Sequence, residues 1–210
     1  SRGLVGSEMC IRDSHKLLSI SGKLSPRIVF GCDNQISELH AFCMFEHFYQ
    51  QGGRIFDTAY IYNDGLSDGY LGKWINERNL KDEIIILGKG VHTPHCEPKN
   101  IRPQLEESLD RMNLDRLDIY CLHRDNPEIP VEEFIEELNE LKSSGLFTLF
   151  GASNWTFERF RKANEYANKN NKEGFKILSN NFSLATMNEP VWPGCVSCDE
   201  EFLDLSLIHI

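Results

Sequence analysis

The stretch IFDTAYIYNDG, residues 55–65, begins as a buried strand would, but it carries a carboxylate at Asp57 and a phenol at Tyr62, five residues further on. Parallel strands that are covered on both faces are nearly continuous apolar runs, so a charge near the end of such a run needs a reason. We interpret residues 54–59 as a buried strand whose carboxyl end carries functional side chains.

The same pattern, a short apolar run followed by a longer helical pattern, recurs along the chain about every thirty residues, the size of a strand-plus-helix unit. Each run is rich in Ile, Val, Leu or Phe, which favour strands. The sequence predicts six strands, at residues 27–31, 54–59, 83–88, 117–122, 147–152 and 175–180.

Between these runs, apolar residues recur at spacings of three and four, as in helices that cover a sheet. The clearest case contains Phe134 and Leu138, with Pro130 near its first turn and Gly145 just beyond its end. Strands that alternate with helices form a parallel sheet, which is either doubly wound or closed into a barrel. Because the first turn lacks the G-x-G-x-x-G phosphate loop of the dinucleotide-binding doubly wound fold, we predict an α/β fold of the TIM type, an incomplete (β/α)8 barrel with about six β/α units present.

Polar residues occupy the carboxyl end of every predicted strand. In a parallel barrel these ends share one rim, where active sites are built from several strands. The residues, in chain order, are Gly31, Cys32 and Asp33; Asp57 and Tyr62; Lys89; His123; Ser153 and Asn154; and Ser179, Asn180 and Asn181.

Four of these residues form a chemical set. A phenol has a pKa near 10, but an ammonium within about 4–6 Å favours the phenolate, and Lys89 could provide that charge to Tyr62. Asp57, on the neighbouring predicted strand, is the carboxylate that would pair with a buried Lys89. His123 could donate a hydrogen bond to a substrate oxygen or relay a proton. Together the four indicate a proton donor to a carbonyl oxygen.

Reduction of a carbonyl also needs a hydride, which proteins obtain from nicotinamide or flavin cofactors. Ser153 and Asn154 offer a hydroxyl and an amide suited to a carboxamide such as that of nicotinamide. Each residue also has an ordinary explanation. His123 or Asp57 can be structural, Tyr62 can be a rim aromatic, and Ser153-Asn154 can be a helix entry. Coincidence at four successive strand ends is much less probable than one shared site.

Four separated motifs resemble the aldo-keto reductase family. FDTAYIYNDGLSDGYLGKWI is similar to the family signature around its catalytic tyrosine, and ILGKG, LDIYCLHRDNP and FGASNW resemble its lysine, histidine and Ser-Asn strands. The resemblance covers nearly all of residues 27–190. It implies a catalytic tetrad of Asp57, Tyr62, Lys89 and His123, with Tyr62 as the general acid. It also implies NADPH as the cofactor, an aldehyde or ketone as the small-molecule substrate, and no metal.

The resemblance further implies cofactor contacts from Gly31, Cys32, Asp33, Ser153, Asn154 and Ser179. Two departures concern single residues: the family commonly has Glu where this chain has Asp68, and usually has Gln on the sixth strand near Ser179. A third is that the family grips the 2′-phosphate and adenine with segments after strands seven and eight, and only six strands are counted.

Composition excludes other classes of protein. A net charge of −10 argues against nucleic acid, because phosphate binding needs clustered Lys and Arg, and no apolar run approaches the roughly 18 residues of a membrane span. Seven irregularly placed cysteines are most simply reduced thiols of a cytoplasmic protein.

The two ends resemble translated adapter or vector sequence. We therefore expect residues 1–15 and 205–210 to be non-native flanks of a partial barrel at 16–204. Two alternatives to a carbonyl reductase stay open. One is a nicotinamide-binding sensor or regulatory barrel with little turnover, and the other is an inactive, incomplete fragment with exposed strand edges.

Overall fold

The structure is a computed structural model, and it describes residues 18–182 and 187–198. These residues belong to two compact units, the first within Ser1–Gly88 and Glu107–Asp118, the second within Lys89–Glu106 and Ile119–Ile210. The predicted flanks, 1–15 and 205–210, lie outside the described residues. No helix in the described ranges is long and apolar enough to cross a membrane.

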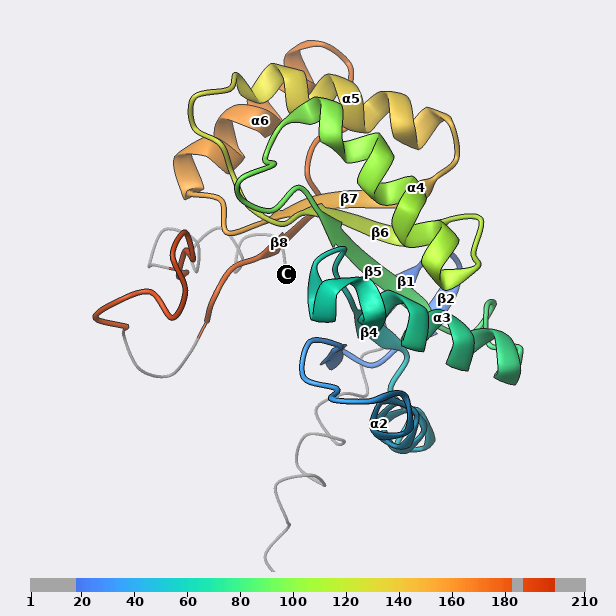
Figure 1. Ribbon diagram of the computed structural model, residues 1–210. Helices are drawn as coiled ribbons and strands as arrows, with labels where there is room; N and C mark the ends of the chain where they lie inside the picture. The colour runs from blue at the N-terminus through green and yellow to red at the C-terminus, as the bar shows by residue number, and fades with distance from the viewer. Residues whose placement is uncertain (1–17, 183–186, 199–210) are drawn as a thin grey trace, which may run out of the picture. The chain divides into compact units, whose positions relative to one another are not determined.

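The first unit begins with an antiparallel hairpin and continues with parallel strands (Figure 1). In the hairpin, β1 (Leu18–Ile20) pairs with β2 (Lys23–Ser25). The next strands are β3 (Val29–Gly31), β4 (Ile55–Asp57) and β5 (Ile85–Gly90). Their registers place Phe30 opposite Phe56 and Phe56 opposite Ile86, in parallel pairs. The parallel strands were predicted, and the hairpin was not.

Two helices of the first unit pack on each other and on the strands. They are α2 (Glu38–Gln50) and α3 (Leu66–Arg78), and the Ser37 side chain caps α2 by accepting a hydrogen bond from the His40 N–H at 3.3 Å. Phe45 of α2, Phe56 of β4 and Trp74 of α3 form one aromatic core, with ring centroids 5.3–5.6 Å apart. Because these rings are buried, the apolar faces predicted for these segments point into one core.

The second unit holds the later strands and helices. Its strands are β6 (Leu117–Leu122), β7 (Phe147–Ser153) and β8 (Ile177–Ser179). Its helical segments are η2 (Pro98–Asn100), α4 (Ile101–Met112), α5 (Val131–Ser143) and α6 (Phe157–Lys169). Of these, β6 begins in the first unit and α4 ends in it. Helices α5 and α6 lie side by side (Figure 1). As predicted, α5 begins directly after Pro130, and Gly145 follows it with a left-handed φ of 82°.

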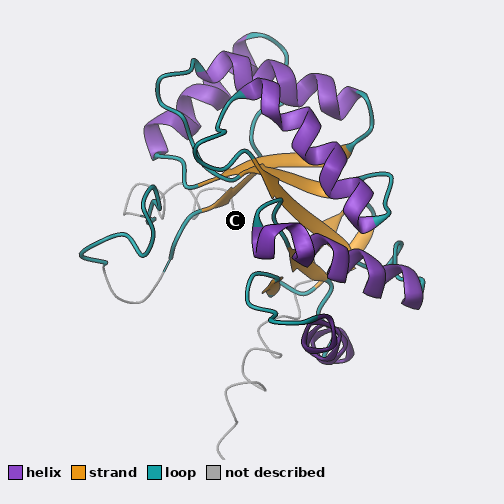
Figure 2. Ribbon diagram, in the orientation of Figure 1, coloured by secondary structure: helices purple, strands orange, loops and turns teal. Residues whose placement is uncertain are grey.

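Six strands hydrogen-bond in the order β3-β4-β5-β6-β7-β8, so each strand neighbours the next in sequence. Figure 2 draws the strands in orange and the helices in purple. A helix lies in every connection between them, which confirms the predicted alternation of strands and helices. β6 has the predicted bounds. β5 continues past residue 88, because the Gly90 carbonyl accepts the His123 N–H at 2.7 Å, so Lys89 lies inside the strand and not after it.

Candidate functional site

In the first unit, the end of β4 is joined to the end of β3. Asp57 is the last residue of β4, and its carbonyl accepts the Cys32 N–H at 2.8 Å. Cys32 is fully buried, whereas Asp33 is exposed and accepts a hydrogen bond from Asn34 Nδ2 at 2.8 Å. Gly31, Cys32 and Asp33 thus form a turn fixed directly beside Asp57.

Tyr62 opens a tight turn after β4. It is the first residue of the 3-10 helix η1 (Tyr62–Gly65), and its N–H donates to the Ala59 carbonyl at 2.9 Å. The next three residues, Asn63, Asp64 and Gly65, have φ values of 49°, 53° and 87°, so the backbone reverses in the left-handed region, where Asn, Asp and Gly are the residues best tolerated. The sequence NDG is therefore what allows a tyrosine to be held at this point.

The turn at Tyr62 is also tied to the loop after β3. Asn63 Nδ2 donates to Ser67 Oγ at 2.8 Å and to the Gln35 carbonyl at 3.2 Å. Gln35 in turn donates to the Gly31 carbonyl at 3.4 Å. Hydrogen bonds of the first unit therefore link the regions of Asp57 and Tyr62, two predicted catalytic residues, to the predicted cofactor-binding turn at residues 31–33.

In the second unit, the structure brings together Lys89 and His123. Lys89 is only 5% exposed on β5, and His123 directly follows β6 at 6% exposure. Burial, followed by the positive charges of Lys89, His92 and Arg124, lowers the pKa of His123 to about 2. The imidazole is therefore neutral at physiological pH, which leaves one ring nitrogen as a donor and the other as an acceptor.

His92 and Arg124 are neighbours of His123 that the sequence analysis did not identify. The His92 ring meets His123 edge to face at a centroid distance of 4.9 Å, and Arg124 Nη1 donates to the His123 carbonyl at 3.0 Å. No local pattern marks His92, because β5 and β6 are distant in sequence, whereas Arg124 directly follows His123 in the chain. The predicted partner, Lys89, was identifiable because lysines are rarely buried inside strands.

Ser153, Asn154 and Ser179 form a second bonded group of the second unit. Ser153 Oγ donates to the Ser179 carbonyl at 2.7 Å and accepts from Asn154 Nδ2 at 2.9 Å. Asn154 Nδ2 also donates to the His123 carbonyl at 3.3 Å, and Asn154 Oδ1 accepts the Val196 N–H at 3.1 Å. Both amide hydrogens of Asn154 are therefore used within the protein.

The hydrogen-bond positions that Ser153 and Asn154 do not use within the protein decide whether they fit a nicotinamide. A hydroxyl oxygen and an amide oxygen each have two lone pairs, so Ser153 Oγ and Asn154 Oδ1 each keep one acceptor position. A carboxamide NH₂ offers two hydrogens, which match these two acceptors. The residues fit the predicted group as acceptors and not as donors.

The loop that begins with His123 is anchored to α6. Arg159 of α6 makes a two-pronged ion pair with Asp125, at 2.9 and 2.8 Å, and also donates to the carbonyls of Asn126 and Ile129. Bidentate arginine–carboxylate pairs fix orientation as well as distance. This anchor was not predicted, since its two partners are 34 residues apart in sequence.

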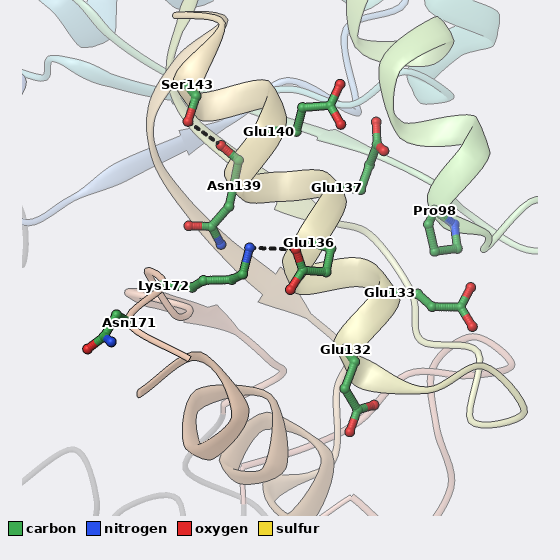
Figure 3. A pocket seen from close by; sticks show the side chains of 10 residues that line it. All are labelled: Pro98, Glu132, Glu133, Glu136, Glu137, Asn139, Glu140, Ser143, Asn171 and Lys172. Atoms are coloured by element: carbon green, nitrogen blue, oxygen red, sulfur yellow. Dashed lines mark hydrogen bonds and ion pairs between the residues drawn. The ribbon is translucent and has the colours of Figure 1, made fainter. Parts of the chain in front are cut away.

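An acidic groove along α5 contains none of the predicted site residues (Figure 3). Lys172 pairs with Glu136 there, and Asn139 lies beside them (Figure 3). The groove is therefore separate from the candidate residues at the strand ends. Among residues 18–182 and 187–198, no group of three or more His, Cys, Asp or Glu side chains has the arrangement of a metal site.

The motifs and the strand order lead to one family. Residues 28–196 match the Aldo/keto reductase family. The chain belongs to this family. Norsolorinic acid reductase B of Aspergillus parasiticus is 27% identical over 177 residues, covering 77% of this chain and 46% of that protein. YrpG of Bacillus subtilis, an uncharacterised oxidoreductase, is 29% identical over 171 residues, covering 74% and 52%. The chain thus spans about half the length of these relatives.

Solved aldo-keto reductases share the fold. Tm1743, a thermostable member crystallised with the inhibitor epalrestat, superposes with a TM-score of 0.64 at 24% identity over 71% of this chain and 58% of that one. A Klebsiella pneumoniae member in complex with NADP and acetate gives 0.59 at 24% identity over 70% and 52%. The predicted family and the predicted TIM-type barrel class with part of its units are confirmed. The roles of the individual site residues stay predictions.

Proposed function

We propose that the protein is an NADPH-dependent reductase of aldehydes or ketones in which Tyr62 donates a proton to the carbonyl oxygen. Membership of the aldo/keto reductase family supports this proposal. So do the reductase names of relatives and the NADP bound to the Klebsiella pneumoniae member.

The proposal assigns one task to each member of the tetrad. Lys89 is proposed to stabilise the phenolate of Tyr62 with its positive charge, so that the proton would be released more readily to the substrate. Asp57 supplies the counter-charge that a buried lysine requires. Neutral His123 donates a hydrogen bond to the substrate oxygen and fixes its position.

The observation that carries the proposal is the buried pair of Lys89 and His123. A charged lysine at 5% exposure inside a strand is costly unless it serves a purpose, and its charge helps to keep His123 neutral. An imidazole that stays neutral can donate a hydrogen bond to a carbonyl oxygen without competing with Tyr62 as the acid.

The proposal keeps the cofactor-binding residues that the sequence analysis predicts. When bound, NADPH supplies the hydride for the carbonyl carbon. Ser153 and Asn154 would accept hydrogen bonds from its carboxamide, and the Ser179 carbonyl accepts the Ser153 hydroxyl hydrogen. The turn of Gly31, Cys32 and Asp33 is proposed as a further contact to the cofactor.

Replacement of the phenol tests the proposal. Tyr62→Phe in the full-length gene product is expected to lower kcat for a simple aldehyde about 100- to 10,000-fold, the usual contribution of a general acid. NADPH affinity, measured by fluorescence quenching, should be unchanged. Tyr70→Phe makes the same chemical change on α3 and should retain wild-type kcat. Undiminished turnover by Tyr62→Phe would remove Tyr62 from the mechanism.

A further inference from the structure

A buried carboxylate lies beside the tyrosine turn in the first unit. Asp68 is the third residue of α3 and is 0% exposed. Thr58 Oγ1 donates to Asp68 Oδ1 at 2.6 Å, and Thr58 is the residue that follows Asp57. Arg111, near the end of α4, places Nη1 3.9 Å from Asp68 Oδ2. Asp68 thus joins the start of the 58–65 segment to a guanidinium on another helix.

The same guanidinium holds the middle of that segment. Arg111 Nη1 donates to the Tyr60 carbonyl at 2.8 Å, and the guanidinium carbon lies 4.5 Å from the centre of the Tyr60 ring. Glu107 completes the arrangement, since it accepts from Arg111 at 2.6 Å and from the Tyr60 hydroxyl at 2.8 Å. Tyr60 is therefore held through its backbone, its ring face and its hydroxyl.

The end of the segment closes against Arg111 as well. Gly65 is buried and has a φ of 87°, and a Cβ atom at this position would overlap the Arg111 guanidinium. Residues Thr58, Tyr60 and Gly65 each contact the pair formed by Asp68 and Arg111. Tyr62 lies between these three points, so its backbone position depends on that pair.

Burial works against the ionised form of Asp68. Burial raises the pKa of its carboxyl group, although the Thr58 and Ser108 hydroxyls and the Arg111 charge favour the ionised form. The pKa of Asp68 is higher in the folded chain than in the unfolded chain. Its contribution to the free energy of unfolding therefore falls as pH rises above the ordinary carboxyl pKa. A neutral isostere should therefore fold at least as well.

We propose that Asp68 is a positioning residue, which acts through Thr58 and Arg111 to fix the 58–65 segment and thereby the Tyr62 hydroxyl. The inference rests on the proposed function of Tyr62. It assigns a task to a buried acid outside the proposed tetrad.

The test compares Asp68→Asn with Asp68→Glu and Asp82→Asn in the full-length gene product. Asp68→Asn is expected to lower kcat roughly 10- to 100-fold, because a misplacement of about 1 Å costs about 100-fold. KM and the NADPH dissociation constant should change less than about threefold, and Tm should stay the same or rise. Asp68→Glu keeps the carboxylate and should recover most of kcat. Asp82→Asn removes an exposed charge of the first unit outside the 58–65 segment and should match the wild type.

A purely structural role predicts a different pattern, namely a lower Tm with unchanged kcat per folded molecule, and that pattern would overturn the inference. If Asp68→Asn does not fold, Arg111→Lys decides, because lysine cannot contact the Tyr60 carbonyl, the Tyr60 ring and Glu107 together. It should show the same loss of kcat with unchanged KM. If Tyr62→Phe keeps its turnover, the proposed function itself fails. If Tyr62→Phe is inactive but both Asp68→Asn and Arg111→Lys retain kcat, only the positioning role fails.

Discussion

The charge state of His123 is the residue-scale property with the clearest consequence. Its folded-state pKa of about 2 lies below the ordinary value of about 6.5. Between these values the unfolded chain binds a proton that the folded chain does not bind, so the free energy of unfolding falls as pH falls below about 6.5, by up to about 1.4 kcal/mol per pH unit. Urea denaturation at several pH values should show this slope, and His123→Asn should lack that part of it.

The control for this prediction is an exposed histidine. His47→Asn, on the exposed face of α2, should leave the pH slope unchanged. Equal slopes in the wild type and in His123→Asn would contradict a neutral, buried His123.

For single residues, the sequence predicts the chemical type but not the charge state or the distant contacts. The sequence identified the chemical type of Lys89 and His123, because polar residues at the ends of apolar strands are conspicuous. It could not predict that His123 is neutral, since that depends first on how deeply the ring is buried and then on how close Lys89, His92 and Arg124 lie. Likewise, Asp68 was noticed only as a departure from a family pattern, and Arg111, 43 residues later (111 − 68), has no local signal.

At the scale of elements, two glycines of α3 provide a matched pair. A Cβ at Gly72 would overlap backbone atoms of Met112 at the end of α4, whereas a Cβ at Gly69 would have no atom within 4 Å. Backbone cannot move aside as a side chain can, so Gly72→Ala should destabilise the protein by about 1–3 kcal/mol. Gly69→Ala improves helix propensity and should stabilise by up to about 1 kcal/mol. Denaturant unfolding measures both, and changes of equal sign would contradict this packing.

Most helices and strands were predictable from the sequence, but the β1–β2 hairpin was not. Runs such as 117–122 are apolar enough that burial alone specifies a strand. The β1–β2 hairpin has strands of only three residues and was not predicted. It is anchored by Lys23, whose ammonium lies 2.9 Å from Asp118 and 2.6 Å from the Ile84 carbonyl. These partners are distant in sequence, so no window of residues around the hairpin contains its main attachment.

At the scale of the whole molecule, cofactor binding should raise the free energy of unfolding. A ligand that binds only the folded state stabilises it by about 2.7 kcal/mol at 100 times its dissociation constant. We expect NADPH to raise the Tm of the full-length gene product, and to raise that of Tyr62→Phe equally, because the phenol is proposed to act on substrate and not on cofactor. Calorimetry with and without NADPH measures both shifts, and a panel of aldehydes measures turnover. A shift without turnover in the wild type would favour the sensor alternative, whereas no shift would contradict NADPH as the cofactor.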